Sequence, residues 1–513
     1  MAVIPGMSDY SGSSPFHLGI TLLLSCLSMM PIYLIGLVVY NVYFHPLAKY
    51  PGPKSMAATR IPNMYMVASG QIHRVITRLH EKYGPVVRVA PNELSFVTNG
   101  EAWKPIYGSR PGHSQKPKDA LFYQETIGGF PSIISSNDAD HTRFRRSLSH
   151  AFSDGSLRGQ EPIIKGYVDL LIQRLHETIN RGTISVDAVS WYNFTTFDII
   201  GDLAFGEPFN CLQDSSYHPW VSMIFAGVKA GAIISLVRRV PYLESLKRLF
   251  TPQKLMHARL DHQRLTKEKV QIRMGKSNDR PDFFANILKQ KDPSKAFSEG
   301  ELYTNADLLI IAGSETTATL LSGATYLLLR SPRAFAKLKE EIRGAFRSDA
   351  DVTLEACNRL VYLQACLNEA LRMYPPVPVG LPRVVDAQGD TIDGHFVPGG
   401  TTVSVSHLTT YHSEKNFKDA RHFLPERHLD DPRYASDNKN ALQPFSFGPR
   451  NCIGRNLAYV EMRLILARLI INFEMELAEP DFDWIDQKVY TLWEKPPLML
   501  KLLPRDIAKS EKA

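Results

Sequence analysis

A segment near the C-terminus, Phe445–Gly454, combines a cysteine, a basic residue and glycines at spacings that suit the binding of a ligand. Gly448 permits a backbone turn that other residues resist, and Cys452 follows it at the start of a predicted helix. Free N–H groups and the helix dipole at such a position favour a thiolate. Gly454 leaves room for the ligand to approach, and Arg450 could pair with an anionic group on it. A thiolate, a basic partner and a cleared approach together suit axial ligation of haem iron.

A long predicted helix carries a second group of polar residues. Ser298 and Glu301 form a capping-box pattern, and the run that follows predicts a helix over Glu299–Arg330. Its middle, 308–329, is apolar on nearly every face, so the alternatives are a second membrane span and a helix buried in a large domain. Glu315 lies in this stretch, and an acid at the centre of a bilayer costs about 3 kcal/mol. We therefore expect a buried helix, in which Glu315 needs a functional reason.

The composition excludes several classes of protein. The chain has 513 residues with a net charge of +7, and its 44% hydrophobic and 22% charged residues favour a large packed core over disorder. Lys and Arg form no dense run with interleaved aromatics, so we expect no nucleic-acid partner. The cysteines are odd in number and form no C-x-x-C pair, which argues against a disulfide framework or a zinc ribbon. They are Cys26, Cys211, Cys357, Cys366 and Cys452.

The N-terminus has the pattern of a membrane anchor. No charged residue occurs between Tyr10 and Ala48, and Leu18–Tyr40 as a helix would be about 34 Å long, enough to cross a bilayer. A cleaved signal peptide is the alternative, but no basic segment precedes the apolar stretch. Lys49 and Lys54 follow it, so the positive-inside rule places the remainder in the cytosol. The expected parts are a luminal N-terminus (1–17), a single transmembrane anchor (18–40), a Pro-rich connector (41–53) and a cytosolic domain (54–513).

The pattern of the remainder indicates a mainly α-helical domain with small β-sheets at its edges. Two short strands are expected at 85–89 and 93–97, and residues 104–138 form a long loop rich in Gly, Pro and Ser. Helical patterns dominate from about residue 140 onward. Further helices are expected at 332–347, 359–374 and 452–473, with a turn at 397–401.

The segment around Cys452 resembles the haem-binding loop F-x-x-G-x-R-x-C-x-G of cytochromes P450, with every specified position filled. Other family motifs occur in the right order. Ala312–Thr317 is similar to the oxygen-binding segment, and Glu369–Arg372 matches E-x-x-R. The segment Phe423–His428 resembles the P-E-R-F region, with His428 in place of the final Phe. The segment His141–Arg145 resembles W-x-x-x-R, with His141 in place of the Trp. The resemblance covers essentially the whole chain and implies the cytochrome P450 fold, with haem (heme b) as cofactor and Cys452 as the axial thiolate ligand of its iron.

The resemblance assigns oxygen chemistry to the middle of the long helix. Ala312 and Gly313 share a helix face with Thr316, and small residues opposite a hydroxyl leave a groove for dioxygen. Thr316 would hydrogen-bond the oxygen, and Glu315 would relay protons to it through water. Both residues are therefore expected to be catalytic.

The threonines of this helix also have a structural alternative. A buried Ser or Thr often donates its hydroxyl to the backbone carbonyl four residues back. We prefer this interpretation for Thr317 and Thr319, and the functional one for Thr316.

Glu369 and Arg372, three residues apart on a helix, are expected to be structural rather than catalytic. Two buried opposite charges require each other and further partners. The family pattern makes Arg427 the third member, and the triad is expected to fix the loop that carries Cys452.

The resemblance also implies which residues hold the haem. Arg450, Arg383 and Arg145 are expected to pair with its propionate groups, and His141, one turn before Arg145, would join them. For Arg145 the alternative is an exposed helix arginine. The other expected haem contacts are Phe445, Gly454, Ala312 and Gly313.

The implied activity is that of a haem-thiolate monooxygenase acting on a hydrophobic small molecule. Electron donation from the thiolate favours O–O bond cleavage. The sequence contains no convincing nucleotide-binding Gly loop or flavin module, so electrons are expected from a separate NADPH-cytochrome P450 reductase. Two alternatives stay open: an isomerase or dehydratase acting on peroxides, which needs no proton relay, and a haem-binding sensor without turnover. The expected location is the endoplasmic reticulum membrane, with the catalytic domain in the cytosol.

Within the family, the segments 44–47 and 444–452 look like those of filamentous-fungal enzymes of secondary metabolism, such as hydroxylases of trichothecene or aflatoxin-type routes. A terpenoid or polyketide intermediate is therefore the expected substrate. The apolar stretch 225–243 could line substrate access, touch the membrane or form an ordinary core helix. The residues expected to touch substrate lie in the segments 104–138, 306–312, 377–381 and 491–493.

Overall fold

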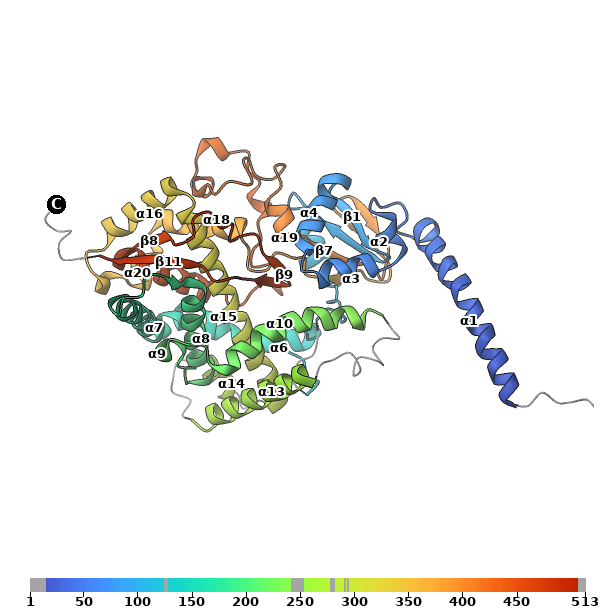
Figure 1. Cartoon of the computed structure of the whole chain (residues 1–513), viewed down its shortest axis with the longest axis horizontal. Helices are drawn as coiled ribbons and strands as arrows, with labels where there is room; N and C mark the ends of the chain where they lie inside the picture. The colour runs from blue at the N-terminus through green and yellow to red at the C-terminus, as the bar shows by residue number, and fades with distance from the viewer. Residues whose placement is uncertain are drawn as a thin grey trace, which may run out of the picture.

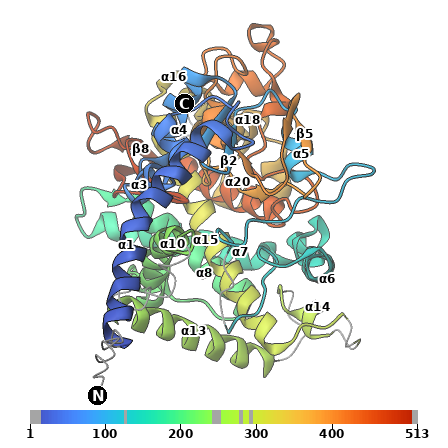
Figure 2. The ribbon, with the colours of Figure 1, turned by 90° about the vertical axis from the view of Figure 1, so that its right-hand side faces the viewer.

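The long capped helix predicted from the sequence is α15 (Glu299–Leu329), which runs through the middle of the molecule (Figure 2). Ser298 and Glu301 form the expected capping box. The helix α8 (Ala188–Phe205) packs along α15, and every residue from Ala318 to Leu328 is buried. The apolar middle of α15 is therefore part of the core of the domain and not a second membrane span.

The computed structural model describes residues 15–123, 128–240, 253–276, 282–289, 292 and 295–505. A helical body with small sheets at its edges makes up most of this part, which confirms the expected fold class (Figure 1). The other α-helices are α1 (Pro15–Val39), α2 (Lys54–Ala58), α3 (Ile61–Ala68), α4 (Ile72–Tyr83), α5 (Trp103–Tyr107), α6 (Asp138–Ser149), α7 (Asp154–Asn180), α9 (Cys211–Asp214), α10 (Pro219–Arg238), α13 (Gln253–Met274), α14 (Ala285–Leu288), α16 (Pro332–Ala345), α17 (Leu354–Asn358), α18 (Val361–Met373), α19 (His407–Tyr411) and α20 (Arg455–Asn472). Short π- or 3-10 turns are η1 (Tyr40–Phe44), η2 (His150–Phe152), η3 (Asp349–Asp351), η4 (Pro425–His428), η5 (Pro432–Tyr434) and η6 (Lys439–Ala441).

The strands within the described ranges form four small sheets. The largest has the order β1-β2-β7-β4, in which β2 and β7 are parallel and the other pairs antiparallel. A second has the order β3-β11-β8, and β5-β6 and β9-β10 are antiparallel pairs. The strands are β1 (Val86–Ala90), β2 (Glu93–Phe96), β3 (Val186–Asp187), β4 (Arg383–Val384), β5 (Asp390–Ile392), β6 (His395–Val397), β7 (Thr402–Val405), β8 (Phe473–Leu477), β9 (Lys488–Tyr490), β10 (Leu492–Glu494) and β11 (Met499–Pro504).

Two helices begin later than the sequence predicts. The helix expected at 452–473 begins only at Arg455, because the amide of Cys452 is bonded within the preceding loop, to the carbonyl of Phe445. The helix expected at 359–374 is α18, which begins only at Val361 because Arg359 caps the C-terminus of the separate helix α17. In the long loop predicted at 104–138, α5 occupies the first residues, and 124–127 lie outside the described residues.

The helix α1 projects away from the body, beside the sheet that contains β1 (Figure 1). Many of its described side chains are large, apolar and exposed, from Leu24 to Val39. In the part of the chain that the structure describes, no helix combines the length and the hydropathy of a membrane span. Most of the predicted luminal segment lies outside the described residues, which begin at Pro15.

Candidate functional site around Cys452

The loop that carries Cys452 has a backbone conformation that favours glycine at one position. Gly448 has a φ of +79°, and a Cβ there would lie 2.2 Å from the carbonyl oxygen of Tyr107 in α5. The amide of Cys452 donates to the carbonyl of Phe445 at 2.8 Å, which closes the loop before α20. The Phe445 ring packs against Tyr459 of α20, with ring centroids 5.4 Å apart. These contacts fix the position of the thiol.

Cys452 differs from the other cysteines whose side chains are described. Cys211, Cys357 and Cys366 are buried, whereas Cys452 is exposed. Burial raises the pKa of the Cys211 and Cys357 thiols to about 12. Burial also raises the pKa of the Cys452 thiol, but the backbone of Gly454 and the charges of Arg145 and Arg455 offset part of that rise. A Cβ at Gly454 would have no neighbour closer than the Cys452 sulfur, at 3.9 Å. The space beside the Cys452 thiol is therefore open to a ligand.

Arg145 of α6 holds the cysteine loop. Its guanidinium donates to the backbone carbonyl of Asn451 at 2.6 Å and to Asn451 Oδ1 at 2.5 Å. Arg145 is partly buried, so the alternative of an exposed helix arginine is wrong. The guanidinium of Arg145 therefore contacts Asn451, the residue that precedes Cys452. It has a different position from Arg450 and Arg383, whose side chains have nitrogens without hydrogen-bond partners within the described residues. Asn451 was not predicted, because a lone asparagine carries no distinguishing pattern in the sequence.

Arg450, Arg383, His141 and Lys118 form a basic cluster with too little negative charge around it. The buried Arg450 side chain donates to Asp138 at 2.7 Å, but its Nε and Nη1 have no partner among the described residues. Arg383 is also buried, and its Nε likewise lacks one. Burial, together with the charge of Arg450, lowers the pKa of His141 to about 4. Burial and the charges of Arg383 and Arg450 hold the pKa of Lys118 well below its usual value.

This basic cluster fits an anionic ligand. Buried guanidinium groups with unused donors are unfavourable unless an anion accepts hydrogen bonds from them. The propionate groups of a haem would supply that negative charge, and the open space beside the Cys452 sulfur would admit its iron. The residues present therefore fit the haem that the sequence motifs imply. Lys118 could not be assigned from the sequence, because only the fold brings the 104–138 loop beside Arg450.

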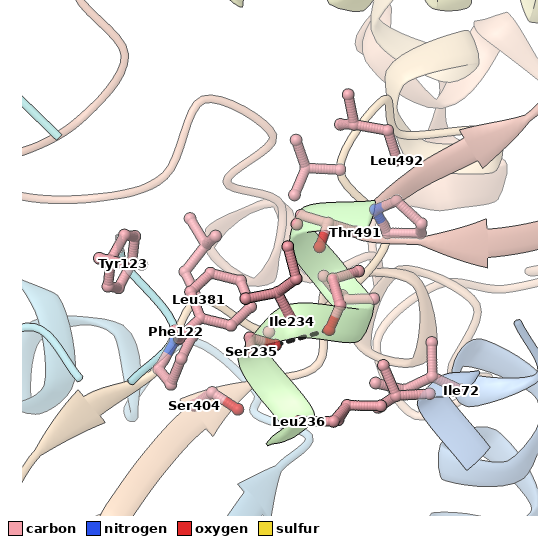
Figure 3. Close-up of a pocket in the computed structure, with 18 of the residues that line it drawn as sticks. Ile72, Phe122, Tyr123, Ile234, Ser235, Leu236, Leu381, Ser404, Thr491 and Leu492 are labelled. Carbon is pink, nitrogen blue, oxygen red and sulfur yellow. Dashed lines mark hydrogen bonds between the residues drawn. The ribbon is translucent and has the colours of Figure 1, made fainter. Parts of the chain in front are cut away.

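A mainly apolar cavity of about 590 Å³ extends from α15 toward α3, α4 and α10 (Figure 3). Phe122 and Leu381 line it from loops, Ile234 and Leu236 from α10, and Leu492 from the β9-β10 hairpin. Such a volume and lining suit a small hydrophobic molecule.

Most of the segments expected to touch substrate contribute residues to the lining of this cavity. Residues 377–381 and part of the 104–138 loop line it, and so do 307, 308, 311 and 312 of the segment 306–312. Thr491 and Leu492 line it too, but Trp493 is buried elsewhere and stacks on Tyr374 with ring centroids 4.6 Å apart. Of the three interpretations of 225–243, the described contacts favour substrate access, because α10 contributes several lining residues. Residues 241–243 lie outside the described part of the chain.

Ala312 and Thr316 of α15 line this cavity, whereas Gly313 faces a neighbouring helix. A Cβ at Gly313 would lie 2.6 Å from Cδ1 of Ile200 in α8, so this glycine allows α8 to approach α15 closely. The glycine is thus needed for helix packing, and the haem contact expected of Gly313 stays a prediction. Thr316 Oγ1 donates to the Ala312 carbonyl at 2.6 Å, the backbone bond that is the structural alternative to a role in oxygen chemistry. The Thr316 side chain also borders the cavity, as the functional interpretation requires.

The acid Glu315 is buried and forms an ion pair with Lys495, which follows β10. The Thr319 hydroxyl donates to Glu315 Oε1 at 3.4 Å and accepts from Lys495 Nζ at 2.7 Å. Thr317 hydrogen-bonds to Glu461 of α20. The backbone bonds expected of Thr317 and Thr319 are therefore wrong, because carboxyl groups engage both hydroxyls: Glu461 of α20 that of Thr317, and Glu315 of α15 itself that of Thr319. Lys495 was not predicted from the sequence.

The structure brings the predicted triad together as a buried cluster. Arg372 donates to both carboxylate oxygens of Glu369 at 2.7 and 2.9 Å, and Arg427 donates to Oε1 at 3.0 Å. His428, which departs from the family motif, joins the cluster with Nε2 at 3.0 Å from Glu369 Oε2, and Arg427 also pairs with Asp437. Burial would raise the pKa of Glu369, but the charge of Arg372 and the other partners outweigh it and hold that pKa below its usual value.

Comparisons with known proteins agree with this geometry. The family model described as Cytochrome P450 matches residues 51–502. The cytochrome P450 monooxygenase astA of Talaromyces wortmannii is 46% identical over 484 residues, which cover 94% of this chain and 97% of that protein. The cytochrome P450 monooxygenase lcsI of Purpureocillium lilacinum is 45% identical over 478 residues, which cover 92% of each. Averantin hydroxylase of Dothistroma septosporum is 44% identical over 477 residues, which cover 92% of this chain and 90% of that protein. The chain therefore belongs to the cytochrome P450 family, in which a cysteine thiolate holds the iron of a haem.

Proposed function

We propose that this chain is a haem-thiolate monooxygenase that oxidises a hydrophobic small molecule with dioxygen and electrons from a separate NADPH-cytochrome P450 reductase. The observation that carries the proposal is the continuity between the cavity and the basic cluster. Thr316 and Tyr123 line the same cavity, and Tyr123 lies within electrostatic range of Arg383 and Arg450. A molecule in the cavity would therefore lie beside the cofactor that the cluster holds.

Several residues would bind the cofactor in this proposal. Cys452 would be the ligand of the haem iron, and the haem with this ligand supplies the activation of dioxygen. Arg450 and Arg383 would donate to the propionates through the nitrogens that lack partners. Arg145 would position the thiolate by holding Asn451, one residue away. The charged cluster of Glu369 would keep the approach to this loop rigid.

Two residues of α15 would handle protons. The Thr316 hydroxyl borders the cavity, where it would hold a water molecule next to dioxygen. Glu315 is one residue away and would supply protons to that water. This role of Glu315 requires it to gain and lose a proton, although it is now paired with Lys495.

The proposed substrate is uncharged and mainly apolar. The surface of the cavity is mainly apolar, and some of its polar side chains are already engaged: Ser235 donates to the Ala232 carbonyl at 2.7 Å, and Arg239 pairs with Asp119 at 2.6 Å. A charged substrate would compete with these bonds and lose its hydration. We propose a terpenoid or polyketide intermediate of fungal secondary metabolism, a class suggested by the sequence motifs.

Reconstitution with a reductase tests this function. The full chain, loaded with haem, should consume oxygen and form an oxidised product only when NADPH and reductase are both present. Comparing the metabolites of a deletion strain with those of its parent would supply candidate substrates. Conversion of a peroxide without NADPH would instead identify an isomerase or dehydratase, and haem binding without any turnover would identify a sensor.

We also propose that residues 18–40 anchor the protein in the endoplasmic reticulum membrane, with 1–17 luminal, 41–53 as connector and 54–513 cytosolic. The support is the exposed apolar surface of α1, which is unfavourable in water. Its exposed side chains include Leu24, Met29, Met30, Ile32, Tyr33, Leu34, Ile35, Leu37 and Val39. Removing residues 1–44 should release the protein from membranes and leave its haem spectrum unchanged. A truncated protein that resists extraction by alkaline carbonate would contradict this topology.

A further inference from the structure

Glu315 and Thr316 are neighbours in the sequence but face different surroundings. Thr316 borders the cavity, whereas Glu315 is 4% exposed and is not among the residues that line it. Successive residues of a helix point about 100° apart, which accounts for the difference. The Oε1 atom of Glu315 accepts from Lys495 and Thr319, while Oε2 has no partner within the described residues. The acid is thus turned into the protein, with one oxygen unused.

Lys495 is placed inside the protein by the alternation of a strand. Glu494, at the end of β10, is exposed and pairs with Lys229 at 2.6 Å. The next residue, Lys495, therefore points inward, and its side chain is only 4% exposed. Its ammonium group donates to two side chains of α15, those of Glu315 and Thr319. The contact ties the segment after β10 to the helix that borders the cavity.

Lys495 is the charged partner that faces Glu315. The other titratable groups within electrostatic range are the phenols of Tyr374 and Tyr217. Burial raises the pKa of both, so they are neutral at physiological pH, and Tyr374 donates to Gln487 at 2.7 Å. Burial also raises the pKa of Glu315, and the positive charge of Lys495 offsets part of that rise. The affinity of Glu315 for a proton therefore depends on Lys495.

Stability alone does not explain this pair. A buried ion pair can often be replaced by apolar residues without loss of stability, because the removal of two charges from water is unfavourable. The pair also lies one residue from Thr316, on the helix that borders the cavity. If Glu315 supplies protons at Thr316, the positive charge of Lys495 has a function, because it controls how readily Glu315 binds and releases a proton.

We propose that Lys495 is a positioning residue of the proton relay, which holds the Glu315 carboxylate away from the cavity and limits its uptake of protons. The inference rests on the proposed function, in which Glu315 supplies protons to water at Thr316. In each cycle Glu315 takes a proton from solvent water and passes it to the water held by Thr316, so no proton is gained or lost by the protein. Without Lys495, the buried acid holds its proton more tightly and releases it less readily.

The test compares four forms of the haem-loaded full chain: wild type, Lys495→Met, Lys495→Arg and Lys488→Met. Lys488 is an exposed lysine on β9, the strand paired with β10, so its replacement is the matched control. The first measurement is the pH titration of the protonated carboxyl band of Glu315 by infrared difference spectroscopy, with Glu315→Gln used to identify the band. The midpoint in Lys495→Met should lie at least one pH unit above that of wild type, whereas those of Lys495→Arg and Lys488→Met should lie close to it.

The second measurement is the pH profile of hydrogen peroxide release with NADPH and reductase. The profile of Lys495→Met should move in the same direction as the infrared midpoint, with unchanged haem content. An unchanged midpoint would overturn the proposal, and so would a shifted midpoint with an unmoved profile. If Lys495→Met fails to bind haem, Lys495→Gln is used under the same criteria. The infrared midpoint could shift as expected in Lys495→Met while the wild-type protein consumes no oxygen. That result would contradict the proposed function and leave the control of Glu315 by Lys495 intact.

Discussion

Replacing Glu461 by glutamine should stabilise the protein at neutral and higher pH, by an amount that grows as the pH rises. Glu461 of α20 is 1% exposed, its Oε2 has no partner within the described residues, and burial raises its pKa from 4.5 to about 8. The unfolded chain loses this proton near the lower value and the folded protein near the higher one. The free energy of unfolding therefore falls as the pH rises between them. The loss of unfolding free energy is about 3 kcal/mol at about pH 7 and about 4 kcal/mol at about pH 8.

Glutamine has nearly the same shape as a protonated glutamic acid and does not titrate, so the variant escapes this loss. Its additional N–H group in the core adds a penalty of about 1–2 kcal/mol that does not depend on pH. The assay is the apparent unfolding midpoint of the haem-loaded protein between about pH 5 and pH 8. Glu476, which is exposed on β8, provides the control variant Glu476→Gln. The curves of wild type and Glu461→Gln should diverge with pH, and curves that stay parallel would refute a neutral acid at this position.

Three further outcomes are expected. Thr316→Ala should keep its fold and haem, because alanine is the best helix former. About tenfold less of the NADPH consumed should lead to product, and more should lead to hydrogen peroxide. An unchanged ratio of product to NADPH would remove this residue from the mechanism. Glu369→Ala leaves Arg372 as a buried charge without its carboxylate, so we expect a loss of about 3–5 kcal/mol and of haem, and full haem content would contradict it. Gly448→Ala brings a Cβ against the Tyr107 carbonyl at a positive φ, so haem content and unfolding temperature should fall together, and a wild-type thermal profile would contradict this close approach.

Features encoded by neighbouring residues could be predicted from the sequence. The capping pair, Ser298 and Glu301, and the apolar run after it locate α15 to within one residue at its C-terminal end. The turn before Cys452 is also encoded locally, because Gly448 itself has the positive φ that the turn requires. The helix α20 begins later than the sequence predicts, since the bond of the Cys452 amide to Phe445 depends on the closed loop.

Features that depend on distant elements could not be predicted in this way. Lys118 and Lys495 have no motif of their own, and each meets its partner only when separate segments fold together. For Thr317 the sequence predicts a bond to the backbone of its own helix, because no local signal places Glu461 beside it. Gly313 lies in a motif that suggests a ligand contact. In the structure, its lack of a side chain leaves room for Ile200 of the neighbouring helix α8, which the local sequence does not reveal.

The central claim is that Cys452 supplies the thiolate that holds the haem iron. The most direct measurement is the absorbance spectrum of the reduced, carbon-monoxide-bound protein for wild type, Cys452→His and the control Cys366→Ala. Cys366 is a buried cysteine of α18, so its loss should leave the spectrum unchanged. Because imidazole donates less electron density than thiolate, Cys452→His should lose the thiolate-type absorption even where it retains haem. A thiolate-type spectrum that persists in Cys452→His would contradict the assignment of this residue.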